Sequence, residues 1–317
     1  MKTTTLLLGT ALLGAAFAAP ATAEEPTIAL VLGQRNSGFH EAIACGARAA
    51  AEELKVTVNI QAAPQYNPAD QIPLLNSVMA SAPAAVVLDP TNTTSLVAPI
   101  REAASTGAKI VAVDTTIDDP SLLSAVVGTD NEAVGRETAR ALAKLLEGKS
   151  GKVAQINSIP GISTVDARIA GFEDEIKKFP NLTYIGNQFA SEDIPAAQSA
   201  FASLMSANPD LIGVVAQSNN PAIGIAGGIR ATGVADDVVA VAVDADDAEI
   251  QALKDNLLDA LVIQQPYEMG YLGLKQAVAA IKGEPVETPI GTGTVTATRE
   301  TLETPEIQKY LYVGNCI

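Results

Sequence analysis

Short β-branched runs alternate with longer helical patterns along almost the whole chain of 317 residues. Repeated strand–helix units of this kind imply parallel sheets joined by right-handed crossovers. Ala, Val, Ile and Leu dominate and Trp is absent, which suits helices packed on parallel strands. The pattern therefore predicts an α/β fold. The expected strands are 27–32, 56–61, 84–88, 109–113, 124–127, 151–157, 182–188, 211–216, 238–243 and 259–264.

The two halves of the chain also resemble each other. The segment QIPLLNSVMASAPAAVV (71–87) is matched by DIPAAQSAFASLMSANPDLIGVV (193–215), with Met79 aligned to Met205. The tetrapeptide VAVD occurs at 111–114 and again at 241–244. Two matches in the same order predict two similar α/β lobes, and a chain of this length normally forms two domains.

The first 23 residues have the pattern of a secretory signal peptide. A lysine precedes a short apolar run, and Ala21-Thr22-Ala23 is a small-residue cleavage pattern. No later stretch is a convincing transmembrane candidate. We expect export to a periplasm with cleavage near Ala23. Loss of Lys2 changes the formal net charge from −16 to −17, which disfavours nucleic acid and anionic membrane as partners.

The chain has two cysteines, Cys45 and Cys316, and we expect them to form a disulfide in an oxidising compartment. Helical periodicity places Cys45 with Glu41, Arg48 and Glu52, opposite the apolar stripe that begins at Phe39. We therefore expect the C-terminal tail to cross this helix. The alternative is two unpaired thiols.

The segment GTDNEAVG (128–135) lies between the expected lobes. Thr129 and Glu132 have the spacing of a capping box for the following helix. Gly128 marks a place where the chain passes from one lobe to the other.

Ligands of parallel α/β sheets bind beyond the carboxyl ends of the strands. The expected strand-end segments are 33–39, 89–92, 114–115, 157–161, 191–193, 217–220, 244 and 264–265.

The first of these segments, within LVLGQRNSGFH (30–40), has the two glycines of a phosphate loop but lacks the Lys and Ser/Thr that such a loop needs. A dinucleotide fingerprint is also missing. Gln34, Asn36 and Ser37 instead offer amides and a hydroxyl, followed by the ring of Phe39. These groups suit a neutral, polyhydroxylated ligand.

Each candidate also has a purely structural interpretation. For Asp89 we expect helix capping. For Asp114 and Asp244, which share the VAVD pattern, we expect ligand contact. Arg168 fits a surface position or a cleft position equally well. His40 has no partner His, Cys or carboxylate at metal-ligand spacing, so we expect no metal site.

Seven segments resemble the ribose-binding-like group of periplasmic substrate-binding proteins of ATP-binding-cassette (ABC) importers. They are TIALVLGQRNSGF, IVAVDTT, VGTDNEAVGR, ARIAGFE, VVAQSNN, VAVDADD and IQQPYEMG, in family order over essentially the whole mature chain. The resemblance implies the type I periplasmic fold, in which two similar lobes, each a parallel sheet flanked by helices, are joined by three crossing strands. The implied lobes are 24–128 plus 265–292, and 129–264 plus 293–317.

The resemblance also implies a ligand site between the lobes. Three departures from ribose binders, Ser37, Thr115 and Glu192, put ribose itself in doubt and leave another monosaccharide, a deoxy sugar, an amino sugar or a sugar alcohol. Gly128 and Gln265 are the implied hinge residues. The implied ligand-binding residues are Asn36, Ser37, Phe39, His40, Asp114, Thr115, Arg168, Glu192, Ser218, Asn219, Asp244 and Gln264.

The implied function is capture of one small sugar or polyol by lobe closure and its delivery to a membrane permease. We expect a monomer without a cofactor, which a chemoreceptor could also recognise. One alternative is an exported carbohydrate-processing enzyme with Asp114 and Asp244 as acid and base. Another is a binding protein for a different small polar ligand, such as an autoinducer sugar. The export signal and the missing helix-turn-helix argue against the sensor core of a repressor.

Overall fold

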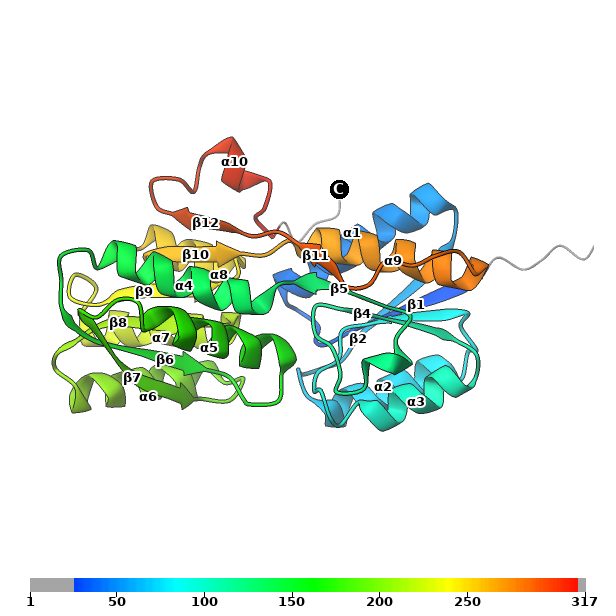
Figure 1. Ribbon diagram of the computed structural model, residues 1–317, viewed down its shortest axis with the longest axis horizontal. Helices are drawn as coiled ribbons and strands as arrows, with labels where there is room; N and C mark the ends of the chain where they lie inside the picture. The colour runs from blue at the N-terminus through cyan, green and yellow to red at the C-terminus, as the bar shows by residue number, and fades with distance from the viewer. Residues whose placement is uncertain (1–25, 313–317) are drawn as a thin grey trace, which may run out of the picture.

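The protein has two lobes that lie side by side along its long axis, each built on one six-stranded sheet (Figure 1). This is a computed structural model, and it describes residues 26–312. The expected signal peptide and Cys316 lie outside the described residues. Within 26–312, no helix is long and apolar enough to cross a membrane.

The strand order is the same in both sheets, as the sequence repeat predicts. Every neighbouring pair is parallel except β10 with β12, which is antiparallel. In the first sheet the strands lie in the order β11 (Ile290–Thr292), β5 (Ala125–Thr129), β4 (Lys109–Val113), β3 (Ala85–Leu88), β1 (Thr27–Leu32), β2 (Thr57–Ala62). In the second they lie in the order β12 (Val295–Thr298), β10 (Ala260–Ile263), β9 (Val239–Val243), β8 (Leu211–Ala216), β6 (Gly151–Asn157), β7 (Leu182–Phe189).

Helices flank both sheets, so the α/β class expected from the sequence is confirmed (Figure 1). Their side chains and those of the strands form the cores; Ile28, Leu30 and Val87 in the first sheet are fully buried. The helices are α1 (Gly38–Leu54), α2 (Pro68–Met79), α3 (Val97–Ser105), α4 (Asn131–Leu145), α5 (Ser163–Ile176), α6 (Ile194–Ala207), α7 (Asn219–Thr232), α8 (Asp247–Lys254), α9 (Pro266–Lys282) and α10 (Pro305–Gln308), with a 3₁₀ turn, η1, at Pro120–Leu122.

The chain crosses between the sheets three times, after β5, after β10 and after β11. The crossing segments contact one another through side chains. Thr129 donates a hydrogen bond from Oγ1 to Oε1 of Gln264 at 2.9 Å, and its Oγ1 lies 3.2 Å from Oγ1 of Thr292. The three crossovers implied by the family resemblance are confirmed.

Two strands and one helix cap differ from expectation. The short strands β11 and β12 were not predicted, because they have three and four residues and neither is an apolar run. The cap of α4 is Asp130, whose side chain accepts from the backbone N–H of Ala133 at 2.9 Å. Thr129 does not cap this helix because it still belongs to β5 and its hydroxyl bonds to Gln264.

Glycines allow one pair of helices in each lobe to touch backbone to backbone. A Cβ on Gly46 of α1 would lie 1.8 Å from the carbonyl oxygen of Tyr267 in α9. In the second lobe, a Cβ on Gly135 of α4 would lie 2.0 Å from the carbonyl oxygen of Arg168 in α5, and one on Gly171 would meet that of Glu132 at 2.1 Å. These contacts fix where α5, and with it Arg168, lies.

Cys45 is buried, although its helical position groups it with three charged residues. Glu41, Arg48 and Glu52 are exposed as expected, but only 7 % of Cys45 is accessible to solvent. Helix α1 packs against both its sheet and α9, so its buried surface is wider than one apolar stripe (Figure 1). The pairing of Cys45 with Cys316 stays a prediction, because Cys316 lies outside the described residues.

Candidate functional site

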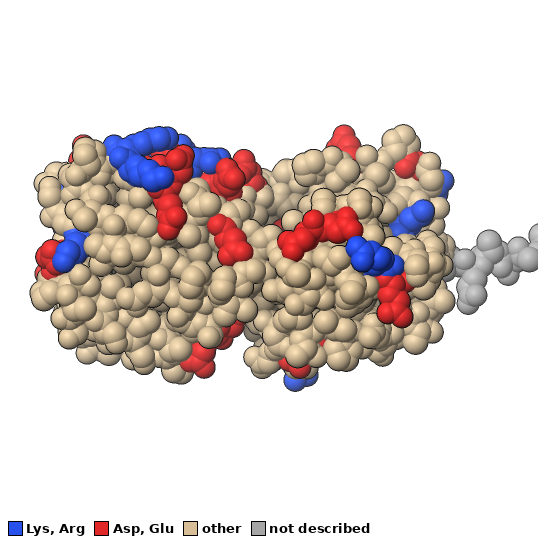
Figure 2. Space-filling view, turned by 60° about the horizontal axis from the view of Figure 1, so that its bottom comes forward, with Lys and Arg blue, Asp and Glu red and all other residues tan. Residues whose placement is uncertain are grey.

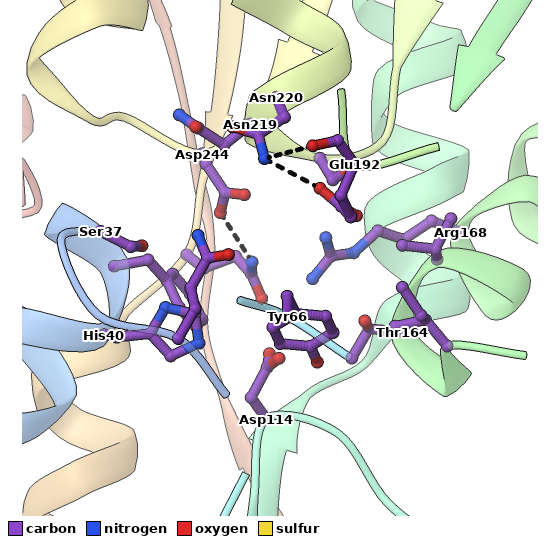
Figure 3. Close-up of a pocket in the computed structure, with 16 residues that line it drawn as sticks. Ser37, His40, Tyr66, Asp114, Thr164, Arg168, Glu192, Asn219, Asn220 and Asp244 are labelled. Carbon is purple, nitrogen blue, oxygen red and sulfur yellow. Dashed lines mark hydrogen bonds between the residues drawn. The ribbon is translucent and has the colours of Figure 1, made fainter. Parts of the chain in front are cut away.

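A cavity lies between the lobes, at the carboxyl ends of strands from both sheets (Figure 3). The space is about 550 Å³ including the part open to solvent, which is within the usual range of small-molecule sites. Acidic side chains flank the crease between the lobes on the face that Figure 2 shows. Sixteen residues line the cavity: Gln34, Ser37, Phe39, His40, Tyr66, Asp114, Ile162, Thr164, Val165, Arg168, Glu192, Ser218, Asn219, Asn220, Asp244 and Gln264.

The structure brings together ten of the twelve candidate ligand-binding residues at this cavity. They are Ser37, Phe39, His40, Asp114, Arg168, Glu192, Ser218, Asn219, Asp244 and Gln264.

Two candidates do not line the cavity. Asn36 is exposed, in a left-handed conformation with φ 59°. Thr115 is fully buried behind Asp114, where its hydroxyl donates to the Asp114 carboxylate at 3.1 Å. Of the polar side chains in the loop before α1, only those of Gln34 and Ser37 therefore line the cavity.

Asp89 does not cap a helix, contrary to expectation, but organises the wall of the first lobe. Its side chain is fully buried and its Oδ2 accepts from the backbone N–H of Gly33 at 3.2 Å. The same oxygen lies 2.9 Å from Nε2 of His40. Asp89, which directly follows β3, thus holds the loop between β1 and α1 and the first turn of α1 in place.

Tyr66, which sequence reasoning missed, completes this wall. It lies in the loop between β2 and α2, where no periodic pattern marks it. Its hydroxyl is 3.0 Å from Oγ1 of Thr115 and 3.5 Å from Oδ1 of Asp89. Burial and the carboxylates of Asp89 and Asp114 raise the pKa of the Tyr66 phenol, so it stays protonated.

Asp114 and Asp244 occupy equivalent places, one residue after β4 and β9. Both have left-handed backbones, with φ 59° and 96°, which are costly for a residue with a side chain. Burial, together with the nearby Asp89 carboxylate, raises the pKa of Asp114 to about 7. Oδ1 of Asp114 is buried without a hydrogen-bond partner among the described residues.

Asp244 is held by Gln264 at the second crossing and by Tyr312, the last described residue. Its Oδ1 accepts from Nε2 of Gln264 at 2.8 Å and from the hydroxyl of Tyr312 at 2.9 Å. The Tyr312 hydroxyl also accepts from the backbone N–H of Gln264 at 3.3 Å. Tyr312 follows no strand and has no motif, so sequence reasoning did not find it.

Arg168 is the buried guanidinium of the second lobe and is 3 % exposed. Its Nε donates to Oδ1 of Asn131 and its Nη1 to the carbonyl oxygen of Gln217, both at 2.8 Å. Nη2 is buried without a partner in 26–312, at the cavity wall (Figure 3). The sequence left open whether Arg168 lies at the surface or in the cleft. In the structure it lies in the cleft.

Glu192 and the two asparagines at the start of α7 form the rest of the acidic wall. Oε2 of Glu192 accepts from Nδ2 of Asn220 at 3.1 Å (Figure 3). Nδ2 of Asn219 donates to the buried Glu249 at 2.8 Å. Burial raises the pKa of both glutamates, and burial with the Asp244 carboxylate raises the pKa of Asp246 to about 6.

The two expected hinge residues lie at crossings. Gly128 of β5 pairs with Gly291 of β11, and a Cβ on Gly128 would approach the carbonyl oxygen of Asp114 to 3.0 Å. Gln265 precedes α9, and its Nε2 lies close to Gly293 of the third crossing. Within 26–312, no group of three or more His, Cys, Asp or Glu side chains is arranged to hold a metal ion.

Comparison with known proteins gives consistent matches over most of the described chain. The family model "Periplasmic binding protein domain" matches residues 28–285. An ABC transporter solute binding protein from Agrobacterium vitis, crystallised with α-D-tagatopyranose, is 34% identical with a TM-score of 0.88 and covers 91% of this chain and 100% of its own. A carbohydrate transporter solute binding protein from Agrobacterium radiobacter, in complex with D-arabinose, is 32% identical with a TM-score of 0.86 and covers 92% and 100%.

A curated relative agrees with these structures. The ribose import binding protein of Salmonella typhimurium is 26% identical over 287 residues, which are 90% of this chain and 95% of that protein. The matched segment includes strands of both sheets and the cavity between them. The chain therefore belongs to the periplasmic binding protein domain family, as its sequence motifs imply.

Proposed function

We propose that the chain captures a monosaccharide or a sugar-like polyol between its two lobes and delivers it to an ABC permease. One observation carries this proposal: both lobes turn toward the cavity buried polar atoms that have no hydrogen-bond partner within residues 26–312. They are Oδ1 of Asp114, Nη2 of Arg168 and Oγ of Ser218. A sugar hydroxyl both donates and accepts, so a ring of hydroxyls satisfies a carboxylate, a guanidinium and an alcohol together.

The apolar part of the wall supports the same ligand class. Phe39, Ile162 and Val165 line the cavity beside the polar groups. Such a mixed wall covers the C–H faces of a sugar ring while the polar groups fix its orientation. The tagatose and arabinose bound by the two solved relatives, and the ribose import of the curated one, support a neutral monosaccharide.

We further propose that lobe rotation at the crossings closes the site. The rotating bodies are 24–128 plus 265–292 and 129–264 plus 293–317, with Gly128 and Gln265 at the hinge. We retain the export signal at 1–23 and the Cys45–Cys316 disulfide as parts of this proposal. The periplasm is an oxidising compartment in which that bond persists.

We propose that the protein binds the sugar without converting it. Asp244 already accepts hydrogen bonds on Oδ1 from Gln264 and Tyr312. Gln264 and Tyr312 thus hold this carboxylate in one orientation at the cavity wall, which suits a fixed binding group. A carbohydrate-processing enzyme would release new products from the sugar that stabilises it, and chromatography of the mixture detects them.

A thermal-shift screen over pentoses, hexoses, amino sugars and polyols, followed by calorimetry, tests the proposal. We expect one or two sugars to raise the unfolding temperature, because a ligand that binds only the folded state stabilises it by mass action. D-tagatose, D-arabinose and D-ribose are the first sugars to try. Failure of every sugar and polyol to stabilise the protein contradicts the proposal.

Asp244→Ala tests the site itself. It leaves Gln264 and Tyr312 without their common acceptor and removes a cavity-lining carboxylate. We expect affinity for the best sugar to fall at least about a hundredfold, since a hydrogen bond to a charged group contributes about 1.5–3 kcal/mol and two orphaned donors add to the loss. Asp174→Ala on α5 is the matched control: it is exposed and does not line the cavity. If Asp244→Ala binds the sugar as tightly as Asp174→Ala, this site is ruled out.

A further inference from the structure

His40 is the one imidazole of the chain, and the fold fixes it at the cavity wall. It lies in the first turn of α1 and is 6 % exposed. Its Nε2 lies 2.9 Å from Oδ2 of Asp89, which is fully buried. The rings of Phe39 and Tyr66 lie beside it, with centroids at 5.5 and 5.9 Å.

The partners of Asp89 determine which nitrogen of His40 carries a proton. Oδ2 of Asp89 already accepts from the backbone N–H of Gly33, and the Tyr66 hydroxyl lies 3.5 Å from Oδ1. An ionised carboxylate only accepts hydrogen bonds, so Nε2 must be the donor. Nδ1 is then the nitrogen that is free to hold either a lone pair or a second proton.

Nδ1 is buried and has no hydrogen-bond partner among the described residues. If His40 only tied α1 to the end of β3, this atom would carry the cost of an unsatisfied buried polar group. His40 lines the same cavity as the unpartnered Nη2 of Arg168, which comes from the other lobe (Figure 3). A ligand in the cavity supplies the missing partner to both.

We propose that Nδ1 of His40 contacts the ligand directly and that Asp89 is a positioning residue, which holds Nε2–H and so aims Nδ1 into the cavity. This inference rests on the proposed function and names a polar contact of that same site. It makes His40 a hydrogen-bonding specificity residue rather than a stacking surface.

The charges around the ring favour the protonated form. Burial alone lowers the pKa of His40, but the hydrogen bond and charge of Asp89, with the carboxylates of Asp114 and Asp246, give a net rise. The imidazolium then donates from Nδ1 to a ring or hydroxyl oxygen of the sugar. In its protonated form, His40 gives the first lobe a cationic donor, as Arg168 does for the second lobe.

Nitrogen-15 NMR of the imidazole tests the inference directly, because a sample without a histidine tag contains one histidine. In the ligand-free protein we expect Nε2 to stay protonated throughout the titration and Nδ1 to be the nitrogen that titrates. Adding the sugar that binds, tried among D-tagatose, D-arabinose and D-ribose, should shift the Nδ1 signal much more than that of Nε2. A neutral form protonated on Nδ1, or a bound sugar that leaves Nδ1 unmoved, overturns the inference.

Two variants separate contact from positioning. His40→Phe keeps a ring but removes both nitrogens, and we expect sugar affinity to fall about ten- to a hundredfold, as for loss of a hydrogen bond to a charged group. Asp89→Asn keeps the shape and one acceptor oxygen, and we expect a smaller loss of affinity with a lower midpoint of the Nδ1 titration. Asp174→Ala should match the parent in both measurements.

The outcomes distinguish this inference from the proposed function. If the parent binds a sugar and His40→Phe binds it equally well while remaining folded by thermal unfolding, only this inference fails. If the parent binds no sugar or polyol at all, the proposed function fails and this inference fails with it. If the midpoint of the Nδ1 titration is the same in Asp89→Asn as in the parent, Asp89 does not position His40.

Discussion

Gly135→Ala should weaken both the second lobe and the ligand site, although Gly135 does not line the cavity. The new Cβ would lie 2.0 Å from the carbonyl oxygen of Arg168, where ordinary contact begins at 3.4 Å. Helices α4 and α5 must therefore separate by about 1.4 Å, because both colliding groups belong to packed backbone that cannot rotate away. Arg168 moves with α5.

The expected loss of stability follows from two opposing effects. Overpacking of a well-packed contact costs about 1–3 kcal/mol, and the backbone obstacle places this case at the upper end. Replacing glycine by alanine inside a helix stabilises the helix by about 1 kcal/mol. We therefore expect a net loss of about 2 kcal/mol in the free energy of unfolding, measured by urea denaturation followed by circular dichroism.

Sugar affinity should fall as well. Arg168 reaches Asn131 on α4 and Gln217 after β8 through bonds of 2.8 Å, so a helix shift of about 1 Å breaks at least one of them or misaims Nη2. We expect at least a tenfold weaker dissociation constant by calorimetry, equivalent to about 1.4 kcal/mol.

Gly227→Ala is the matched control for this prediction. Gly227 also lies inside a helix, α7, but its added Cβ would meet only the end of the Gln198 side chain, at 3.2 Å. We expect this variant to be as stable as the parent, or more stable by up to about 1 kcal/mol, with unchanged affinity. If Gly135→Ala behaves like Gly227→Ala, the close contact of α4 with α5 is not what positions Arg168.

Further predictions concern the groups around the two aspartates. Tyr312→Phe removes the donor to Asp244 and the acceptor of the Gln264 N–H; we expect a loss of about 2 kcal/mol in the free energy of unfolding, and denaturation curves equal to the parent's would contradict it. Because the folded-state pKa of Asp114 is raised to about 7, its contribution to the stability of the ligand-free protein is complete below the unfolded pKa, near 4, and is lost as the pH rises through 7. Thermal unfolding from pH 4.5 to 8 should therefore show a steeper decline for the parent than for Asp114→Asn, and parallel profiles would refute this assignment. Asp246, with a pKa raised to about 6, contributes in the same direction at lower pH.

The sequence predicts the strands well where an apolar β-branched run is bounded by turn residues. The expected 109–113, 151–157 and 211–216 coincide with β4, β6 and β8. The short edge strands β11 and β12 could not be recognised, because their hydrogen bonding depends on β5 and β10, which lie far away in the sequence. Their pairing is a consequence of the lobe arrangement rather than of a local pattern.

Site residues were predictable where the fold places them directly after a strand. Asp114 and Asp244 could be found because a parallel sheet brings strand ends to one edge. Tyr66 and Tyr312 could not, since each reaches the site from an irregular segment whose path is set by tertiary packing. Asp89 has the same strand-end position as Asp114, but whether such a carboxylate faces a cap, a histidine or a ligand depends on the loop opposite it.

The side-chain amide of Gln264 joins a crossing segment between the lobes to the wall of the cavity. Its oxygen accepts from Thr129 on one connecting segment, and its nitrogen donates to Asp244 in the binding wall. In the proposed function, a sugar bound to Asp244 is therefore connected to the crossing segment of Thr129 through two hydrogen bonds of one planar amide. If the lobes rotate as proposed, altering Thr129 should change the balance between the open and closed forms through Gln264, without replacing any cavity-lining residue.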